Sequence, residues 1–399
     1  MNAPLPTDAI QDVLNDDLSR ARTLPASAYT SHDVLEWEQH VAFDGGWTCV
    51  GRSDDYLAPG DQIAISVGQT SVLMMRDQDG ALNAFYNVCR HRGHELLPCG
   101  EKTNRRSLRC PYHSWLYNLD GSLKAASRFR DTENFDAAQW PLIPVRCTEW
   151  NGWVFLNMSG AGPAFPNWVG NLDEILEPYA IGTMRIATAH NYVVEANWKT
   201  IVENYLECYH CPSIHPELCR VSPPDSAQAF AQSGYWIGGP MQLRDRADTM
   251  SLDGSGRPPL PGLSEHARRT VCYFVLPANL LISAHPDYVM THRLLPLSPN
   301  RTSVECAWLF PAEAIAEDGF DPAYAADFWD ITNRQDFAAC ESVTRGLASA
   351  GYRPGPFDAR EDGVRAFQEQ IARLYITAEW HRARGAQMGS EQATAPSRA

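Results

Sequence analysis

The segments CRHRG (residues 89–93) and CPYHSW (residues 110–115) decide how the first half of this chain folds. Each supplies one Cys and one His, and 18 residues separate the first His from the second Cys. Two thiolates and two imidazoles can hold a tetrahedral zinc, or a [2Fe–2S] cluster in which two His replace two Cys on one iron. Zinc sites of mixed ligation usually pair like ligands along the chain, so one Cys and one His per segment favours the cluster. The candidate ligands are Cys89, His91, Cys110 and His113.

The composition excludes several classes of function. A chain of 399 residues is too long for one hydrophobic core and suggests about two domains. Its formal net charge of −15 repels phosphate groups, so neither nucleic acid nor an anionic membrane surface is an expected partner. We find no run of about 18 apolar residues, and the acidic start of the chain does not resemble a signal peptide. Eleven cysteines, an odd number in a long chain, do not indicate a disulfide scaffold, so we expect a cytoplasmic protein.

The spacing at which apolar residues recur changes along the chain and indicates where its domains begin and end. Apolar residues recur at helical spacing before Gly45, and from Trp47 the period becomes two, with Asp-Gly hairpin signals at 79–80 and 120–121. Further strand-like runs follow a Gly- and Pro-rich linker, and 323–350 has the pattern of one long helix. Strands followed by helices, without βαβ alternation, predict an α+β second domain. We expect a helical lead-in (residues 1–44) that packs on the second domain, and an all-β cluster domain (45–160). The second domain itself (161–384) and a disordered tail (385–399) follow.

The segment NWKTIVENYLECYHCPSIHPEL (residues 197–218) contains a second candidate metal site. We predict a helix over 197–211, on which Glu207 and His210, three residues apart, share a face. Because the residue before a proline avoids helical geometry, the Cys-Pro step should end this helix, and a turn can then bring His215 back to His210. Two His with a carboxylate form the facial triad of non-haem Fe(II) oxygenases. Taken alone, both His could equally be buried core residues, and it is the accompanying redox cluster that favours iron.

Together, the two motifs resemble those of the α subunits of Rieske-type non-haem iron oxygenases. They resemble most of all the enzymes that act on quaternary ammonium compounds, the glycine betaine and choline monooxygenases, over about residues 40–350. The gap between the cluster segments departs slightly from the family, because it lies near the upper end of the usual spacing and indicates a longer loop (GEKTNRRSLR, 100–109). The resemblance implies a Rieske [2Fe–2S] β domain joined to a helix-grip catalytic domain, in which an antiparallel sheet curves around a long helix and a mononuclear Fe(II) is bound.

The resemblance also assigns residues of the second site. The family takes its third iron ligand from the long C-terminal helix, where Asp336 matches best and Asp330 and Glu341 are the rivals. Because Asp330 and Asp336 lie six residues apart, they do not share a helix face, and one alone can point at the iron. Glu207 is implied to bridge electron transfer from a cluster His of a neighbouring subunit to His210. His94, just behind the first cluster segment, is a less favoured ligand candidate.

The expected function follows from these assignments. No dinucleotide-binding fingerprint occurs, so electrons must come from a separate NAD(P)H-dependent reductase of the flavin or ferredoxin type. By resemblance the chain is a terminal oxygenase that uses dioxygen to hydroxylate a C–H bond, within a homotrimer. We expect the target to be an N-methyl group of a quaternary ammonium or betaine-type substrate, which would lose formaldehyde. The alternatives are a ring-hydroxylating oxygenase of an aromatic acid and, less favoured, a Rieske electron carrier or a binding protein.

A methylated ammonium group cannot donate a hydrogen bond and is held mainly by aromatic faces. Candidate faces, each also explained by core packing, are Tyr205, Tyr209, Tyr235, Trp236, Tyr273, Phe274 and Tyr288. A carboxylate end could bind an arginine, although a solvated surface charge is the favoured role for each of Arg244, Arg246 and Arg293. The remaining cysteines are expected to be core hydrophobes or inert thiols, namely Cys49, Cys99, Cys147, Cys208, Cys211, Cys219, Cys272, Cys306 and Cys340.

Overall fold

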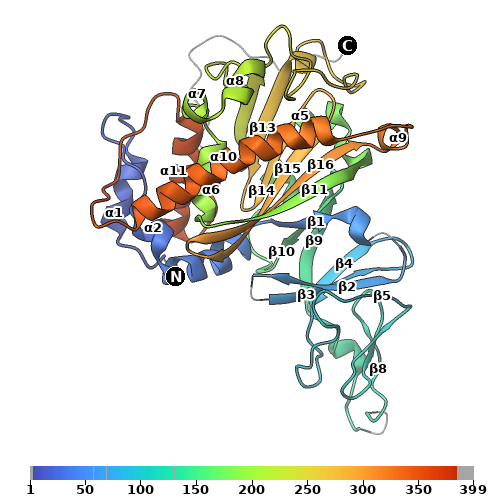
Figure 1. Ribbon diagram of the computed structural model, residues 1–399. Helices are drawn as coiled ribbons and strands as arrows, with labels where there is room; N and C mark the ends of the chain where they lie inside the picture. Colours follow the sequence, from blue (N-terminus) through green and yellow to red (C-terminus); the bar gives the residue numbers. More distant parts are fainter. Residues whose placement is uncertain (1–2, 57, 69, 130–131, 384–399) are drawn as a thin grey trace. The chain divides into compact units, whose positions relative to one another are not determined.

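The computed structural model describes residues 3–383 except 57, 69, 130 and 131 (Figure 1). The tail expected at 385–399 lies outside the described residues. Contacts divide the chain into two compact units, one formed by residues 47–161 and one by the residues up to 46 together with those from 162 onward. The N-terminal residues therefore pack with the C-terminal part of the chain.

The unit at 47–161 is an antiparallel β structure. Its larger sheet has seven strands in the order β1-β10-β9-β4-β3-β2-β5, and its smaller sheet has three in the order β6-β7-β8. Apolar residues form two buried clusters, one of which contains both candidate cluster cysteines. The strands are β1 (Thr48–Arg52), β2 (Asp61–Val67), β3 (Thr70–Arg76), β4 (Leu82–Tyr86), β5 (Lys102–Asn104), β6 (Leu108–Arg109), β7 (Leu116–Tyr117), β8 (Leu123–Ala125), β9 (Pro144–Trp150) and β10 (Trp153–Asn157).

Both predicted Asp-Gly turns occur in this unit. Gly80 lies between β3 and β4 with φ 86°, and Gly121 lies between β7 and β8 with φ 80°, conformations that L side chains rarely adopt. A Cβ atom at Gly121 would also lie 2.3 Å from the ring of Phe85 in β4. Glycine at this position therefore lets the smaller sheet turn close against a strand of the larger one.

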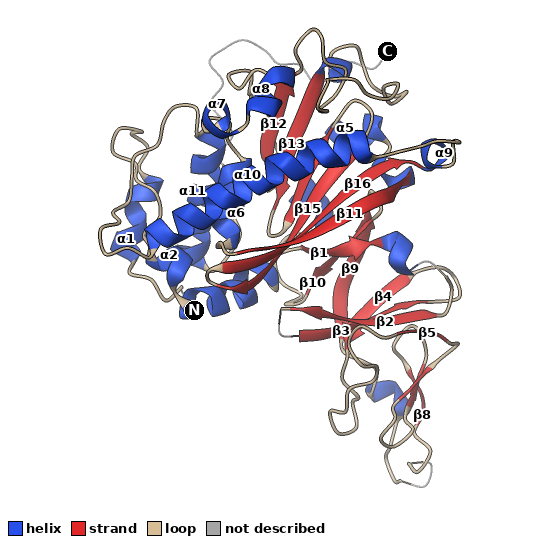
Figure 2. Cartoon of the chain, viewed as in Figure 1, coloured by secondary structure: helices blue, strands red, loops and turns tan. Residues whose placement is uncertain are grey.

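The second unit is built on a six-stranded antiparallel sheet in the order β11-β16-β15-β14-β13-β12. The long helix α10 (Ala323–Leu347) runs across one face of this sheet (Figure 2). Its buried residues Ala325, Phe328 and Trp329 join one core cluster with apolar residues of the sheet. This arrangement confirms the α+β helix-grip prediction. The strands are β11 (Met184–Val194), β12 (Ile237–Gln242), β13 (Thr270–Leu276), β14 (Leu280–Ala284), β15 (Val289–Ser298) and β16 (Arg301–Pro311).

The helices of this unit differ from the prediction in two places. The helix expected over 197–211 ends at Tyr205, and α11, for which we made no prediction, covers Asp362–Thr377. Within the described residues, no helix is long and apolar enough to span a bilayer. The remaining helices are α1 (Thr7–Gln11), α2 (Ser27–Thr30), α3 (His32–Glu38), α4 (Phe165–Val169), α5 (Leu172–Leu176), α6 (Trp198–Tyr205), α7 (Cys211–Ile214), α8 (Pro216–Val221) and α9 (Ala312–Ile315).

A buried ion pair ties α6 to the N-terminal helices and to α11. The Lys199 ammonium lies 2.7 Å from Glu38 Oε1, and both side chains are at most 1% exposed. Glu38 also accepts hydrogen bonds from Trp198 Nε1 at 2.9 Å and from the Tyr375 hydroxyl. Because every charge here is paired and hydrogen-bonded, removal of one partner would leave the other buried and uncompensated.

We predict that Lys199→Ala lowers the free energy of unfolding by about 3–5 kcal/mol, the usual cost of an orphaned buried charge. The matched control is Arg301→Ala, which breaks the exposed pair between Arg301 and Glu195 and should cost at most about 1 kcal/mol. Denaturant titration of both variants measures the difference. Equal losses would show that the buried pair does not stabilise the unit.

Candidate metal centres

The two cluster segments form loops with the same backbone hydrogen bonds. In the first loop Gly93 N donates to Cys89 O at 3.0 Å, and Cys89 N donates to His94 O at 2.8 Å. In the second, Ser114 N donates to Cys110 O at 3.0 Å, and Cys110 N donates to Trp115 O at 2.8 Å. Gly93 and Ser114, each four residues after its Cys, both have positive φ, 71° and 59°. The repeated geometry presents one Cys and one His from each loop.

The four side chains of these loops lie together. Cys89 and Cys110 are buried, at 2% and 1% exposure, and their thiols interact. The rings of His91 and His113 are half-buried and their centroids lie 4.6 Å apart. Among the described residues, buried His91 Nδ1 has no hydrogen-bond partner, which is unusual for a buried nitrogen. Paired thiols inside and an unpartnered imidazole nitrogen beside a second imidazole fit a cluster with two Cys and two His ligands.

The second motif places its two His at the ends of a short helix. After α6 ends at Tyr205, the Glu207 carboxylate accepts the backbone N–H of Tyr209 and, at 3.2 Å, that of His210. This local capture of backbone donors competes with helix continuation and explains why α6 stops earlier than predicted. Helices α7 and α8 each carry proline in their first turn, a position that favours the start of a helix. His210 therefore precedes α7 as its N-cap, and His215 follows it as its C-cap.

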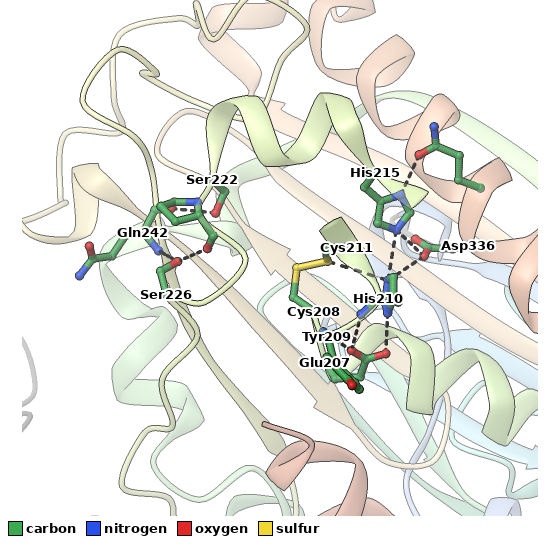
Figure 3. Close-up of a disulfide and its surroundings, with 12 residues drawn as sticks. Glu207, Cys208, Tyr209, His210, Cys211, His215, Ser222, Ser226, Gln242 and Asp336 are labelled. Atoms are coloured by element: carbon green, nitrogen blue, oxygen red, sulfur yellow. Dashed lines mark hydrogen bonds and ion pairs between the residues drawn. A yellow bond between two sulfur atoms is a disulfide. The ribbon is translucent and has the colours of Figure 1, made fainter. Parts of the chain in front are cut away.

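Asp336 of α10 meets both His of the second motif (Figure 3). His210 Nε2 and His215 Nε2 lie 3.1 Å apart, and Asp336 Oδ1 lies 3.3 Å from the first and 2.8 Å from the second. Three potential ligand atoms from two distant parts of the sequence therefore converge on one point. His215 is 1% exposed, so the point is sheltered from water on that side.

The other nitrogen of each imidazole has an acceptor of its own. His210 Nδ1 lies 2.5 Å from Glu207 Oε1, and His215 Nδ1 lies 2.7 Å from Gln335 Oε1. The Gln335 amide nitrogen donates to Glu217 at 3.4 Å, so its oxygen faces His215 and Nδ1 must be the donor. With Nδ1 as the donor, each imidazole directs Nε2 at Asp336, and its lone pair is available for a metal whenever Nε2 carries no proton. Sequence reasoning missed Gln335, although it directly precedes Asp336.

This arrangement fits a cation. Two Nε2 lone pairs and a carboxylate oxygen repel one another at these distances unless a proton or metal ion lies between them. Burial alone would lower the pKa of His210, but hydrogen bonds and charge from Asp336 and Glu207 raise it to about 9. Two imidazoles and one carboxylate on one side of a metal are the donor set of non-haem Fe(II) sites.

The rival carboxylates of α10 point elsewhere. Asp330 accepts from the Tyr192 hydroxyl at 2.6 Å and pairs with Arg334 at 2.7 Å. Glu341 accepts the backbone N–H of Glu195 at 3.3 Å. Asp330 is six residues from Asp336, so the two lie on different faces of the helix, as the helical period requires.

Cys208 and Cys211 correct one prediction, because they form a disulfide and are not inert thiols. Their Cα atoms lie 4.9 Å apart, within the range that a disulfide spans. The Cys-x-x-Cys spacing was the available sequence signal. Cys211 Sγ lies 3.9 Å from His210 Nε2, but its place in the disulfide withholds a thiolate from the metal point (Figure 3).

Comparison with known proteins identifies the family. Residues 46–136 match the Rieske [2Fe-2S] domain and residues 181–377 match the ring hydroxylating alpha subunit (catalytic domain). The glycine betaine monooxygenase oxygenase subunit of Chromohalobacter salexigens is 30% identical, over 88% of this chain and 86% of its own. The carnitine monooxygenase oxygenase subunit of Escherichia coli K12 is 38% identical, over 84% and 86%. The chain belongs to the Rieske non-haem iron oxygenases.

A solved structure supports the same family. A quaternary ammonium Rieske monooxygenase, described in connection with carnitine oxidation and inter-subunit electron transfer, aligns with a TM-score of 0.76 and 27% identity over 94% of this chain and 100% of its own. This oxygenase therefore uses a Rieske [2Fe–2S] cluster and a mononuclear iron.

Of the candidate aromatic faces, two pack against each other and against a residue of α10. The Tyr205 and Tyr273 rings lie 5.8 Å apart, and Trp329, which sequence reasoning missed, lies 6.4 Å from Tyr273. By contrast, Tyr235 stacks on Trp168 and Tyr209 is 51% exposed. The other expected faces and arginines have partners of their own: Trp236 packs on Phe274, Tyr288 stacks on His285, Arg293 pairs with Glu305 and Arg244 donates to Cys219 O.

We predict that Asp336→Ala weakens Fe(II) binding by at least about tenfold, the lower limit found for outer-shell partners, while the cluster content stays unchanged. Asp330→Ala removes a carboxylate from the same helix and should keep full iron. Iron and acid-labile sulfide analysis of both purified variants measures the effect. Full iron in Asp336→Ala with loss in Asp330→Ala would transfer the ligand role to Asp330.

Proposed function

We propose that this oxygenase hydroxylates an N-methyl group of a methylated ammonium carboxylate of the betaine or carnitine type. The convergence of His210, His215 and Asp336 on one point is the observation that carries the proposal. The relatives named for glycine betaine and carnitine support the substrate class.

We place the domain boundaries at 44/45 and 160/161, as the change of sequence period indicates.

In this proposal Cys89, Cys110, His91 and His113 hold the cluster, and His210, His215 and Asp336 hold the mononuclear iron. When bound, the iron activates dioxygen with electrons supplied through the cluster. Glu207 and Gln335 keep the protons of the two imidazoles on Nδ1 and so keep both Nε2 lone pairs directed at the metal.

The proposed reaction divides the two atoms of dioxygen between the substrate and water. One oxygen atom enters an N-methyl C–H bond, and the other becomes water with two electrons and two protons. The resulting N-hydroxymethyl ammonium loses formaldehyde and one proton, which leaves a dimethylamino product. The two electrons come from a separate NAD(P)H-dependent reductase.

Aromatic side chains beside the iron point suit a cationic substrate. Burial raises the pKa of Tyr273 most, followed by the neighbouring Tyr205 and Cys272 and last by the Asp336 charge. Trp329 lies seven residues before Asp336 and therefore on the same face of α10. Each aromatic face contributes about 0.5–2 kcal/mol to binding a quaternary ammonium. An aromatic acid would gain less from these faces and would need a cationic partner.

We further propose a cytoplasmic homotrimer in which electrons pass between subunits. The related monooxygenase of known structure, described with inter-subunit electron transfer, supports this route. Glu207 would be its last link, since its carboxylate contacts His210 Nδ1 directly and its side chain keeps 12% exposure. Head-to-tail contacts that repeat between copies would bring the cluster of one copy to Glu207 of the next and close into a ring.

Oxygen uptake with a surrogate reductase tests the substrate class. We expect uptake and an equal amount of formaldehyde with glycine betaine, carnitine or γ-butyrobetaine. The matched control for each compound is its tert-butyl analogue, which has the same shape without the charge and should bind at least about tenfold more weakly. Uptake with benzoates, and none with any methylated ammonium compound, would contradict the proposal.

For Glu207 we predict that the Glu207→Gln variant keeps both metals but oxidises its reduced cluster at least about tenfold more slowly. The amide retains an oxygen acceptor for His210 Nδ1 and loses the charge. Glu217→Gln is the control, because Glu217 contacts Gln335 and not an imidazole. Single-turnover spectroscopy of the pre-reduced protein with substrate gives the rate. Cluster oxidation at the unmodified rate would remove Glu207 from the electron route.

A further inference from the structure

The Cys208–Cys211 disulfide encloses one of the two imidazoles of the proposed iron site. It joins residues three apart, so Tyr209 and His210 lie inside the loop that it closes. A disulfide stabilises a fold mainly by restricting the unfolded chain, and the gain grows with the length of the closed loop. A loop this short gains little, so stability does not account for a disulfide at this place.

The two sulfur atoms of this disulfide differ in their access to solvent. Cys211 is 2% exposed, whereas Cys208 is half-buried and its neighbour Tyr209 is 51% exposed. A thiolate that reduces a disulfide must reach one of the two sulfurs and displaces the other. Cys208 is the sulfur that can be reached, so Cys211 is the one that is set free, beside His210.

The sulfur of Cys211 lies close to both imidazoles (Figure 3). Its Sγ is 3.9 Å from His210 Nε2, and Sγ and one ligand nitrogen each of His210 and His215 all lie within 4.8 Å of one another. The two Nε2 atoms are 3.1 Å apart. Around a tetrahedral zinc, a sulfur and a nitrogen ligand lie about 3.5 Å apart and two nitrogens about 3.3 Å apart. A shift of Sγ by about 1 Å would therefore give zinc-ligand spacing.

The disulfide determines how many ligands the site can offer. With the disulfide intact, the donors are the two Nε2 atoms and Asp336 Oδ1, which lies 3.3 Å and 2.8 Å from them. Three ligands leave positions open, as an iron that reacts with dioxygen requires. Adding the Cys211 thiolate makes four, and zinc sites that are closed by four protein ligands, thiolates among them, have no open position.

We propose that Cys208 and Cys211 form a thiol switch that decides which metal this site accepts. The disulfide form offers three ligands and takes Fe(II), whereas in the dithiol form the Cys211 thiolate completes a closed four-ligand site for Zn²⁺. The disulfides of proteins in reducing compartments are mostly transient and catalytic or redox-sensing, which fits the proposed cytoplasmic location. The inference rests on the proposed ligand set of His210, His215 and Asp336 and is independent of the proposed substrate.

The switch requires a dithiol as reductant. One thiolate of the dithiol attacks Cys208 Sγ, the S–S bond breaks, and Cys211 leaves as a thiolate. The second thiolate of the reductant then attacks the mixed disulfide and releases Cys208. The reductant loses two electrons and becomes a disulfide, and the two protein sulfurs gain these electrons. Of the two protons that the reductant gives up, one ends on Cys208 and one passes to solvent when Cys211 binds zinc.

The test identifies the zinc ligands in the full-length, cluster-loaded protein after a chelator has removed the mononuclear metal. One equivalent of Zn²⁺ is the probe, and X-ray absorption at the zinc edge does not detect the irons of the cluster. The disulfide form is compared with protein that was reduced by dithiothreitol and then freed of it without air. The matched variants are Cys208→Ser and Cys211→Ser, because both abolish the disulfide and the first alone keeps the Cys211 thiol.

We expect one sulfur ligand at about 2.3 Å from zinc in the reduced protein and, without any reductant, in the Cys208→Ser variant. The disulfide form and the Cys211→Ser variant should show nitrogen and oxygen ligands alone. They should also bind zinc at least about tenfold more weakly, since loss of an outer-shell partner already costs that much. The visible spectrum of the cluster should be the same in all four samples.

Nitrogen and oxygen ligands alone in both the reduced protein and Cys208→Ser would overturn the proposal and leave the three-ligand set standing. Equal sulfur ligation in the two variants would also overturn it, because the sulfur would then come from another thiol. Absence of bound zinc from every sample would overturn the switch and the ligand set together. None of these results depends on whether a betaine is turned over, so failure here and failure of the proposed substrate remain distinguishable.

Discussion

The second metal centre depends on one physical constraint, the meeting of two imidazole lone pairs and a carboxylate within 3.3 Å. Such a group is stable only around a positive charge. The fold supplies acceptors for both Nδ1 atoms and leaves both Nε2 atoms without a backbone partner among the described residues. These hydrogen bonds make Nδ1 the donor of each ring, so the lone pair of each Nε2 is directed at the metal.

The rest of the unit holds these groups in place. Asp336 comes from a helix of 25 residues that crosses the sheet, and both His cap a helix of four residues. So short a helix has little stability of its own and must be held by its neighbours. Helix α6, which leads into it, is fixed by the buried pair of Lys199 with Glu38 and by Asn197, whose amide donates to Tyr29 O and Pro299 O. N-terminal residues thus stabilise a site that lies far along the chain.

The sequence pattern predicted an α+β second domain, and the motif predicted that His210 and His215 converge, because metal ligation restricts both residue type and spacing. The helix-grip fold came from the resemblance to the family. The resemblance to the family singled out Asp336, while the helical period showed only that Asp330 and Asp336 cannot both face the iron. The end of α6 could not be predicted, since it depends on the Glu207 side chain capturing two backbone N–H groups. Gln335 and Trp329 were missed because a neutral amide and a core tryptophan carry no signal until their neighbours in space are known. The Cys-x-x-Cys spacing of Cys208 and Cys211 is present in the sequence, but we expected two separate thiols and the structure has a disulfide.

The most direct measurement of the central claim is Mössbauer spectroscopy of the protein loaded with ⁵⁷Fe in the absence of zinc. The account predicts two kinds of iron, a mixed-ligand [2Fe–2S] cluster and a high-spin Fe(II) with nitrogen and oxygen ligands, in a ratio of about two cluster irons to one. Cluster signals alone, at full cluster occupancy and with Fe(II) in excess, would contradict it.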